Sequence, residues 1–93
     1  MTLLEEWVGK AEEDYEAAVA LNRRRRRPLP DAVCFHCQQC AEKYLKALLV
    51  ARGIEPPRIH ELEILLRQCA VNDPWIVALG QDARQVSPYS VAM

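Results

Sequence analysis

The chain has 93 residues, which suffice for one small domain and exclude a two-domain enzyme. Hydrophobic residues make up 51% and charged residues 27%, a composition typical of a folded protein. Twelve basic against 13 acidic residues give a formal net charge of −1, so any affinity for nucleic acid must come from a local cluster. The apolar runs are too short to cross a membrane, and the acidic N-terminus is unlike a signal peptide. We therefore expect a cytoplasmic protein whose four cysteines are reduced.

The first predicted element is a helix that extends to about Asn22. Thr2 and Glu5 have the spacing of a capping box, in which the hydroxyl and the carboxylate each bind a free backbone N–H. Apolar residues then recur at helical intervals on one face: Leu4, Trp7, Val8, Ala11, Tyr15, Ala18 and Val19. Five consecutive arginines, Arg23 to Arg27, and two nearby prolines follow and end the helix.

The second predicted helix has Asp31 as its N-cap, runs to about Arg52 and stops at Gly53. More than half of its girth is apolar, so we expect it to pack on several neighbours as the central element. The apolar face comprises Val33, Cys34, Cys37, Ala41, Tyr44, Leu45, Leu48 and Leu49. His36, Gln39 and Lys43 form a polar stripe on the opposite side, with Lys46 at its edge.

Two shorter helices are predicted after a proline-containing linker. The third covers His60 to Val71, with its inward face formed by Leu62, Leu65, Leu66 and Cys69. The fourth starts with Asp73 as N-cap and Pro74 at the first position, and ends at Ser87-Pro88. Its apolar residues are Trp75, Ile76, Leu79 and Ala83. No segment reads as a strand, so the fold class is all-α, an antiparallel bundle of about four helices.

The cysteines at positions 34, 37 and 40 raise the question of a metal site, with Cys69 as a fourth sulfur. Side chains three apart on a helix rotate by about 60°, so these thiols fan out instead of converging. We therefore expect no metal and no cofactor, and interpret the cysteines as small core residues. A redox role is disfavoured because reactive Cys pairs lie at helix N-termini.

Two groups of polar residues are candidates for binding. Arg23, Arg24, Arg25, Arg26 and Arg27 are either a solvated helix end or a site for phosphates or an acidic partner. The stripe of His36, Gln39 and Lys43 is either the solvated side of its helix or the lining of a groove that binds nucleotide. If the first two helices are antiparallel, the arginines and His36 converge on one electropositive edge. No catalytic set can be placed together from the sequence.

One long motif runs through the second helix and the linker after it. It reads F-H-x-Q-Q-x-x-E-K-x-L-K-A-L-L from Phe35, and Gly53, Pro57 and a His-x-Leu at His60 follow. In this motif, and in Ala11, Asp14 and Tyr15 of the first helix, the chain resembles the HEPN domain family (higher eukaryotes and prokaryotes nucleotide-binding). Positions 37 and 40 are commonly alanine in that family, which favours packing roles for both cysteines.

The resemblance implies a helical bundle that usually forms a homodimer and is often encoded beside a minimal nucleotidyltransferase as a toxin–antitoxin pair. Many branches are metal-independent ribonucleases with an Arg, four to six intervening residues and a His, but no arginine precedes His36 or His60 at that distance. We therefore expect a non-catalytic partner of a nucleotidyltransferase, with nucleotide or RNA as a further ligand. The alternatives are a ribonuclease toxin and a metal-binding helical module. The branch usually continues with another helix, so residues 1–93 are expected to form one HEPN-like domain that is incomplete at its C-terminus.

Overall fold

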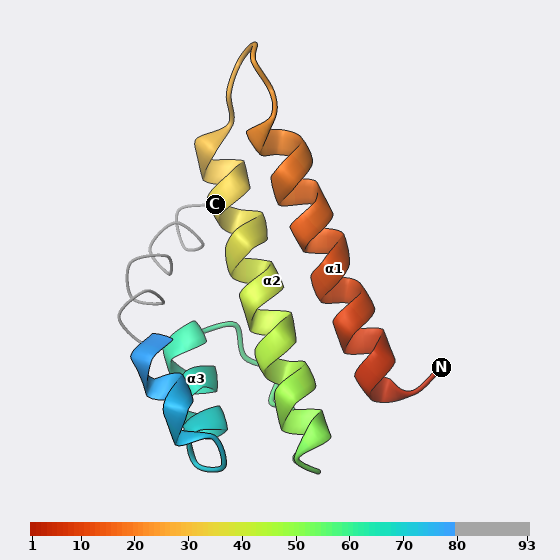
Figure 1. Ribbon diagram of the computed structural model, residues 1–93, viewed down its shortest axis with the longest axis vertical. Coiled ribbons are helices and arrows are strands. Elements are labelled where there is room, and N and C mark those ends of the chain that lie inside the picture. The colour runs from red at the N-terminus through yellow and green to blue at the C-terminus, as the bar shows by residue number, and fades with distance from the viewer. Residues whose placement is uncertain (80–93) are drawn as a thin grey trace.

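A computed structural model describes residues 1–79 of the chain, with side chains up to residue 76. It contains three α-helices, α1 (Leu3–Asn22), α2 (Pro30–Ala51) and α3 (Leu62–Ala70), and a short 3-10 helix, η1 (Pro74–Leu79). α1 and α2 form an antiparallel hairpin, and α3 with η1 lies on the other side of α2 (Figure 1). No strand occurs among the described residues, so the all-α fold class and the central place of α2 are confirmed.

The N-terminus of α1 is fixed by the predicted capping box. The backbone N–H of Glu5 donates to Thr2 Oγ1 at 3.1 Å, and the Thr2 N–H donates to Glu5 Oε1 at 3.4 Å. Two of the free N–H groups of the helix end are thereby satisfied. α1 ends at Asn22 as expected, and the loop that follows contains Arg27 at a positive φ of 52°.

α2 begins differently from the prediction and ends as predicted. Leu29, not Asp31, is the N-cap residue, and Pro30 occupies the first helical position, where its missing N–H costs nothing. At the other end Gly53 has a φ of 77°, in the left-handed region that favours glycine. The N–H of Ile54 donates to Leu49 O at 2.9 Å and that of Gly53 to Val50 O at 3.0 Å, which is a Schellman motif.

The hydrophobic core lies between α2, α3 and η1. It comprises Leu45, Leu49, Leu62, Leu65, Leu66, Cys69 and Ile76. All four residues predicted to face inward from the third helix belong to it, although that helix begins two residues later than expected. α1 contributes nothing to this cluster, because its buried residues are Ala11, Asp14 and Ala18. The fully buried side chains of α1 are therefore two alanines and one carboxylate.

The fourth predicted helix is a 3-10 helix from Pro74 to Leu79. Asp73 precedes it, and its carboxylate pairs with Arg52 of α2, accepting from Nε at 2.9 Å and from a second guanidinium nitrogen. Ile76 is buried as expected, but Trp75 is 68% exposed, so its predicted inward position is wrong. A 3-10 helix has three residues per turn, so successive side chains point about 120° apart, and Trp75 turns outward when Ile76 turns inward. The predicted positions of Ala83 and of the Ser87-Pro88 stop lie outside the described residues. None of the described helices combines the length and the apolarity that a membrane span requires.

Candidate functional site

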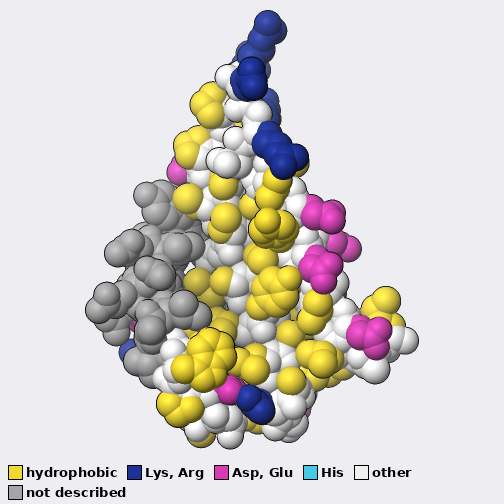
Figure 2. Space-filling view, viewed as in Figure 1, with side chains coloured by type: hydrophobic (Ala, Val, Ile, Leu, Met, Phe, Trp, Pro, Cys, Tyr) yellow, Lys and Arg dark blue, Asp and Glu magenta, His cyan; other side chains and the backbone are white. Residues whose placement is uncertain are grey.

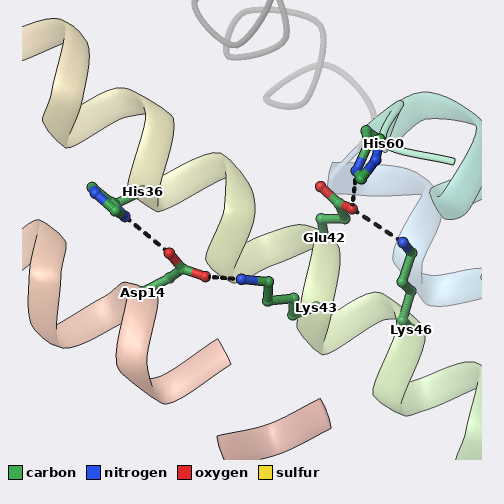
Figure 3. A network of polar contacts seen from close by, with 6 residues as sticks. All are labelled: Asp14, His36, Glu42, Lys43, Lys46 and His60. Carbon is green, nitrogen blue, oxygen red and sulfur yellow. Dashed lines mark hydrogen bonds and ion pairs between the residues drawn. The ribbon is translucent and has the colours of Figure 1, made fainter. Parts of the chain in front are cut away.

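The first of two polar networks lies between α1 and α2 (Figure 3). Asp14 of α1 accepts from His36 Nδ1 at 2.9 Å through one carboxylate oxygen, and from Lys43 Nζ through the other. His36 and Lys43 are two turns apart on α2, so one carboxylate receives both side chains. The three residues, called here the Asp14 network, tie the two helices together at the point where their contact is otherwise formed by alanines.

Asp14 stays ionised in this position because its partners outweigh its burial. Burial by itself would raise the pKa of the carboxyl group, but the hydrogen bonds and positive charges of Lys43 and His36 bring that pKa below its ordinary value. A buried carboxylate without such partners would be costly. The network is therefore a stabilising contact of the helical hairpin that depends on the charge of Asp14.

The second network lies around Glu42, further round α2 and toward the segment that leads into α3 (Figure 3). Glu42 Oε1 accepts from Lys46 Nζ at 3.1 Å and faces His60 Nδ1 at 2.7 Å. The Lys46 ammonium also lies 5.3 Å from the ring centroid of Trp7 on α1, within cation–π range. These contacts, called here the Glu42 network, join α1, α2 and the segment that leads into α3.

His60 is the exposed member of the Glu42 network, with a side chain 75% accessible, whereas Glu42 is only 2% exposed. Gln38 supports the same segment, because its Nε2 donates to the backbone oxygen of His60 at 3.0 Å. With Nδ1 directed at the carboxylate, the imidazole turns Nε2 to solvent. A carboxylate-oriented imidazole of this kind is chemically able to accept a proton. Buried Gln38 Oε1 and Glu42 Oε2 accept no hydrogen bond from the residues that the structure describes.

The five arginines project from the loop at the tip of the α1–α2 hairpin. All of Arg23 to Arg27 are exposed, and the space-filling view shows dark-blue side chains at this end of the molecule (Figure 2). None of them forms an ion pair with another side chain in the part of the chain that the structure describes. The loop therefore concentrates positive charge that no residue within 1–79 neutralises through an ion pair.

The polar stripe predicted on α2 is divided by the structure. His36 and Lys43 turn toward α1 and bind Asp14, so they are not a fully solvated side of α2, and ligand binding by the stripe stays a prediction. Gln39 is half-buried and makes no side-chain hydrogen bond with the described residues. The physical reason is that Asp14 of α1 lies at the same level as these two residues, so its carboxylate attracts the Lys43 ammonium and accepts a hydrogen bond from the His36 imidazole.

Comparison with protein families matches residues 4–92 to the HEPN domain. The chain belongs to the HEPN domain family. No curated protein and no solved structure shows a significant match. The resemblance drawn from the α2 motif is thus confirmed, and the motif residues now have structural roles: in this HEPN domain Gln38, Glu42, Lys43 and Lys46 all belong to, or directly support, the two networks.

The cysteines of this HEPN domain differ in their surroundings. Cys69 is buried in the core and donates from Sγ to Leu45 O at 3.4 Å. Cys34 and Cys40 are half-buried and Cys37 is exposed, so the prediction of a core position is wrong for Cys37. α3 packs on the second half of α2 and leaves Cys37 uncovered (Figure 1). Burial raises the thiol pKa of Cys37, Cys40 and Cys69. Within residues 1–79, no three His, Cys, Asp or Glu side chains are arranged to hold a metal ion.

Sequence reasoning missed the Glu42 network as a group. It placed His60 at the start of the third helix and Lys46 at the edge of a polar stripe, while Glu42 entered only through the family motif. The usable signal was the Glu42–Lys46 spacing of four residues, which places the two side chains on one helix face. What the spacing could not show is that Trp7 and His60 would cover this pair.

Proposed function

We propose that this HEPN domain is a non-catalytic binding protein that assembles with a minimal nucleotidyltransferase in a toxin–antitoxin-type pair. The arginine loop, Arg23 to Arg27, is its contact with an acidic surface of that enzyme. The observation that supports this proposal is the loop itself: five exposed guanidinium groups with no ion pair to the described part of the chain.

The arginine loop contributes little to the stability of the fold and is better explained as a contact with an anionic partner. Exposed ion pairs and exposed charges contribute little to the free energy of unfolding, about 0–1 kcal/mol each. Five like charges in succession repel one another, which is a cost to the free protein. Arginine forms bidentate hydrogen bonds with carboxylates and phosphates, so an anionic partner relieves the repulsion and gains directional contacts.

Binding to the purified nucleotidyltransferase, followed by calorimetry at several salt concentrations, tests the proposal. We expect the triple variant Arg24→Ser, Arg25→Ser, Arg26→Ser to bind at least about tenfold more weakly, with a flatter salt dependence. The control replaces Arg58 and Arg67, two exposed arginines outside the loop, by serine. Equal affinity of wild type and triple variant would overturn the proposal. If the wild type ignores the enzyme but binds an RNA oligonucleotide through the loop, the ligand is phosphate instead.

A second candidate function, ribonuclease activity, is favoured by the exposed His60 held by buried Glu42. Nε2 of such an imidazole can take the proton of a ribose 2′-hydroxyl as a general base. RNA cleavage in the presence of EDTA that disappears in His60→Ala, while His36→Ala keeps it, would support this function. Cleavage that is absent in the wild type excludes it.

A further inference from the structure

The arginine loop, Arg23 to Arg27, stands at the tip of the α1–α2 hairpin, away from α3 and η1 (Figure 1). Every side chain of residues 22–31 is exposed, and within residues 1–76 no other run of exposed side chains is as long. Exposed loop tips with polar residues are the preferred sites at which proteases cut folded proteins. Arginine is moreover the residue after which a whole class of endoproteases cleaves. The loop therefore has the exposure and the chemistry of a cleavage site.

The backbone of the arginine loop has few hydrogen bonds to break. The N–H groups of Arg23 and Arg24 donate at 3.2 Å to carbonyl oxygens of the last turn of α1. Arg25, Arg26 and Arg27 form no backbone hydrogen bond with the described residues. Arg27 also has a φ of 52°, a left-handed conformation that is strained for a residue with a Cβ. Drawing this segment into the extended form that a protease binds therefore breaks no backbone hydrogen bond of these three residues and relieves the strain.

The segment around Arg58, which lies between α2 and α3, is fixed more firmly. Arg58 is exposed, but its neighbour Ile59 packs against the hydrophobic core. The backbone oxygen of His60 accepts from Gln38 Nε2 at 3.0 Å. Extending the chain around Arg58 breaks both contacts, so we expect it to be a poor protease site. The remaining basic residues within 1–79 lie in an α-helix or at its end: Lys10, Lys43, Lys46, Arg52 and Arg67.

We propose that the arginine loop is a cleavage site of an arginine-specific endoprotease, and that the acidic partner bound to the loop protects it from cleavage. Hydrolysis breaks the peptide bond after one of the arginines: water adds its hydroxyl to the carbonyl carbon of that arginine and a proton to the nitrogen of the next residue. The bonds that qualify run from Arg23–Arg24 to Arg26–Arg27, because Pro28 has no N–H and its ring obstructs a cut after Arg27. The protection rests on the proposed function, whereas the cleavage rests on the loop alone.

Cleavage in the loop leaves the fold in place. All members of the hydrophobic core lie in α2, α3 and η1, and therefore on the C-terminal piece. Asp14 on the N-terminal piece keeps its contacts with His36 and Lys43. The ring of Trp7 remains next to the Lys46 ammonium, at 5.3 Å. We therefore expect the two pieces to stay together as a nicked hairpin.

Cleavage weakens the binding of the partner. After a cut between Arg25 and Arg26, the arginines are divided between two free chain ends, and the hairpin turn no longer holds them in one place. The new carboxylate of Arg25 also attracts the guanidinium groups beside it. An anionic partner thus loses a pre-organised site, which lowers its affinity. Free copies of the domain are inactivated in this way, while copies with the partner in place are spared.

Limited digestion of the full chain with trypsin tests the cleavage, because trypsin accepts both Lys and Arg and its choice among them reports local structure. Mass spectrometry assigns each cut. We expect cuts in the arginine loop to be at least about tenfold faster than those after Arg58 or Arg67, with the helical circular dichroism signal retained. The control Arg58→Gln should leave the rate of the loop cut unchanged. The loop cut should disappear in the quadruple variant Arg23→Gln, Arg24→Gln, Arg25→Gln, Arg26→Gln.

Protection by the partner and processing in cells are measured separately. Saturating nucleotidyltransferase should slow the loop cut at least about fivefold, without changing the rate of the cut after Arg67. In host cells that make the chain without this enzyme, wild type should yield fragments that end at residues 23–26, whereas the quadruple variant stays intact.

The outcomes separate this inference from the proposed function. Cuts after Arg58 or Arg67 that are as fast as those in the loop overturn the loop as the cleavage site, and the absence of loop fragments from host cells overturns its processing there. A loop cut that the bound nucleotidyltransferase does not slow overturns the protection. If the wild type does not bind the enzyme at all, the proposed function and the protection fail together, while the cleavage is still decided by the digestion and the fragments.

Discussion

Lys46 donates to Glu42 at 3.1 Å across one turn of α2, and both side chains are nearly inaccessible, at 6% and 2% exposed. Two opposite charges have thus been removed from water together in a chain of 93 residues. The ammonium is further covered by the ring of Trp7, and the carboxylate by His60. The pair is tolerable only because each ion has several partners, so the integrity of the whole Glu42 network depends on both members.

Removing one member of the Glu42–Lys46 pair should strongly destabilise the fold. We expect Lys46→Met, which keeps most of the side-chain volume, to lower the free energy of unfolding by about 3–5 kcal/mol because Glu42 is left without its main counter-charge. Urea denaturation measures the change. The matched control is Lys10→Met, because the Lys10 ammonium also lies over Trp7, at 5.1 Å, but on an exposed side chain. Its loss should cost about 0.5–1 kcal/mol. If both variants lose a similar amount of free energy of unfolding, the buried Glu42–Lys46 ion pair does not contribute more to stability than the exposed Lys10 contact.

The stability of the hairpin should depend on pH through Asp14. Its pKa in the folded protein is below the ordinary 3.8, so the stabilisation is present above that value and is lost as the pH falls through the folded pKa. We expect the free energy of unfolding of wild type to fall below about pH 4, and Asp14→Asn to show a smaller fall. Urea titrations over this range measure both. The variant Glu13→Gln, at an exposed neighbouring position, serves as the control, and an identical acid response of Asp14→Asn and wild type would contradict the prediction.

The two described glycines should respond in opposite directions to alanine. Gly53 has a φ of 77° in the Schellman motif after α2, so Gly53→Ala should destabilise by about 1 kcal/mol through backbone strain. Gly9 lies in the interior of α1 with no atom near an added Cβ, so Gly9→Ala should stabilise by about 0.5–1 kcal/mol. Thermal melts of both variants check the signs. If both variants shift the melting temperature in the same direction, the role expected for at least one of the two glycines is wrong.

Thiol reactivity should distinguish the cysteines. Cys37 is exposed whereas Cys69 is buried and hydrogen-bonded, so an aromatic disulfide reagent should label Cys37 first and Cys69 only on unfolding. Because the thiol pKa of Cys37 is raised, its labelling at neutral pH should be slower than that of a free thiol and should accelerate at higher pH. The Cys37→Ser variant identifies the fast phase. Elemental analysis of the same preparation should find no stoichiometric zinc or iron, as the fanned thiols predict.

The sequence by itself determined the local structure. Helical periodicity and capping residues act over three or four positions, so the capping box at Thr2, the glycine stop at Gly53 and the inward residues of α3 could be read directly. The family followed from one continuous motif on α2, and the match over residues 4–92 confirms it. The start of α2 was misplaced by two residues because Asp31 and Pro30 both favour a helix N-terminus and only one of them could define it.

Only the tertiary structure decided where the polar residues of α2 point. A helical wheel shows that His36 and Lys43 lie on one side of α2. It does not show that Asp14, more than twenty positions away in the sequence, lies beside them on α1. The same holds for Glu42, which reads as a solvated residue until His60 and Trp7 close over its network. Charge pairing across helices depends on the relative position of whole elements, which local propensity does not encode.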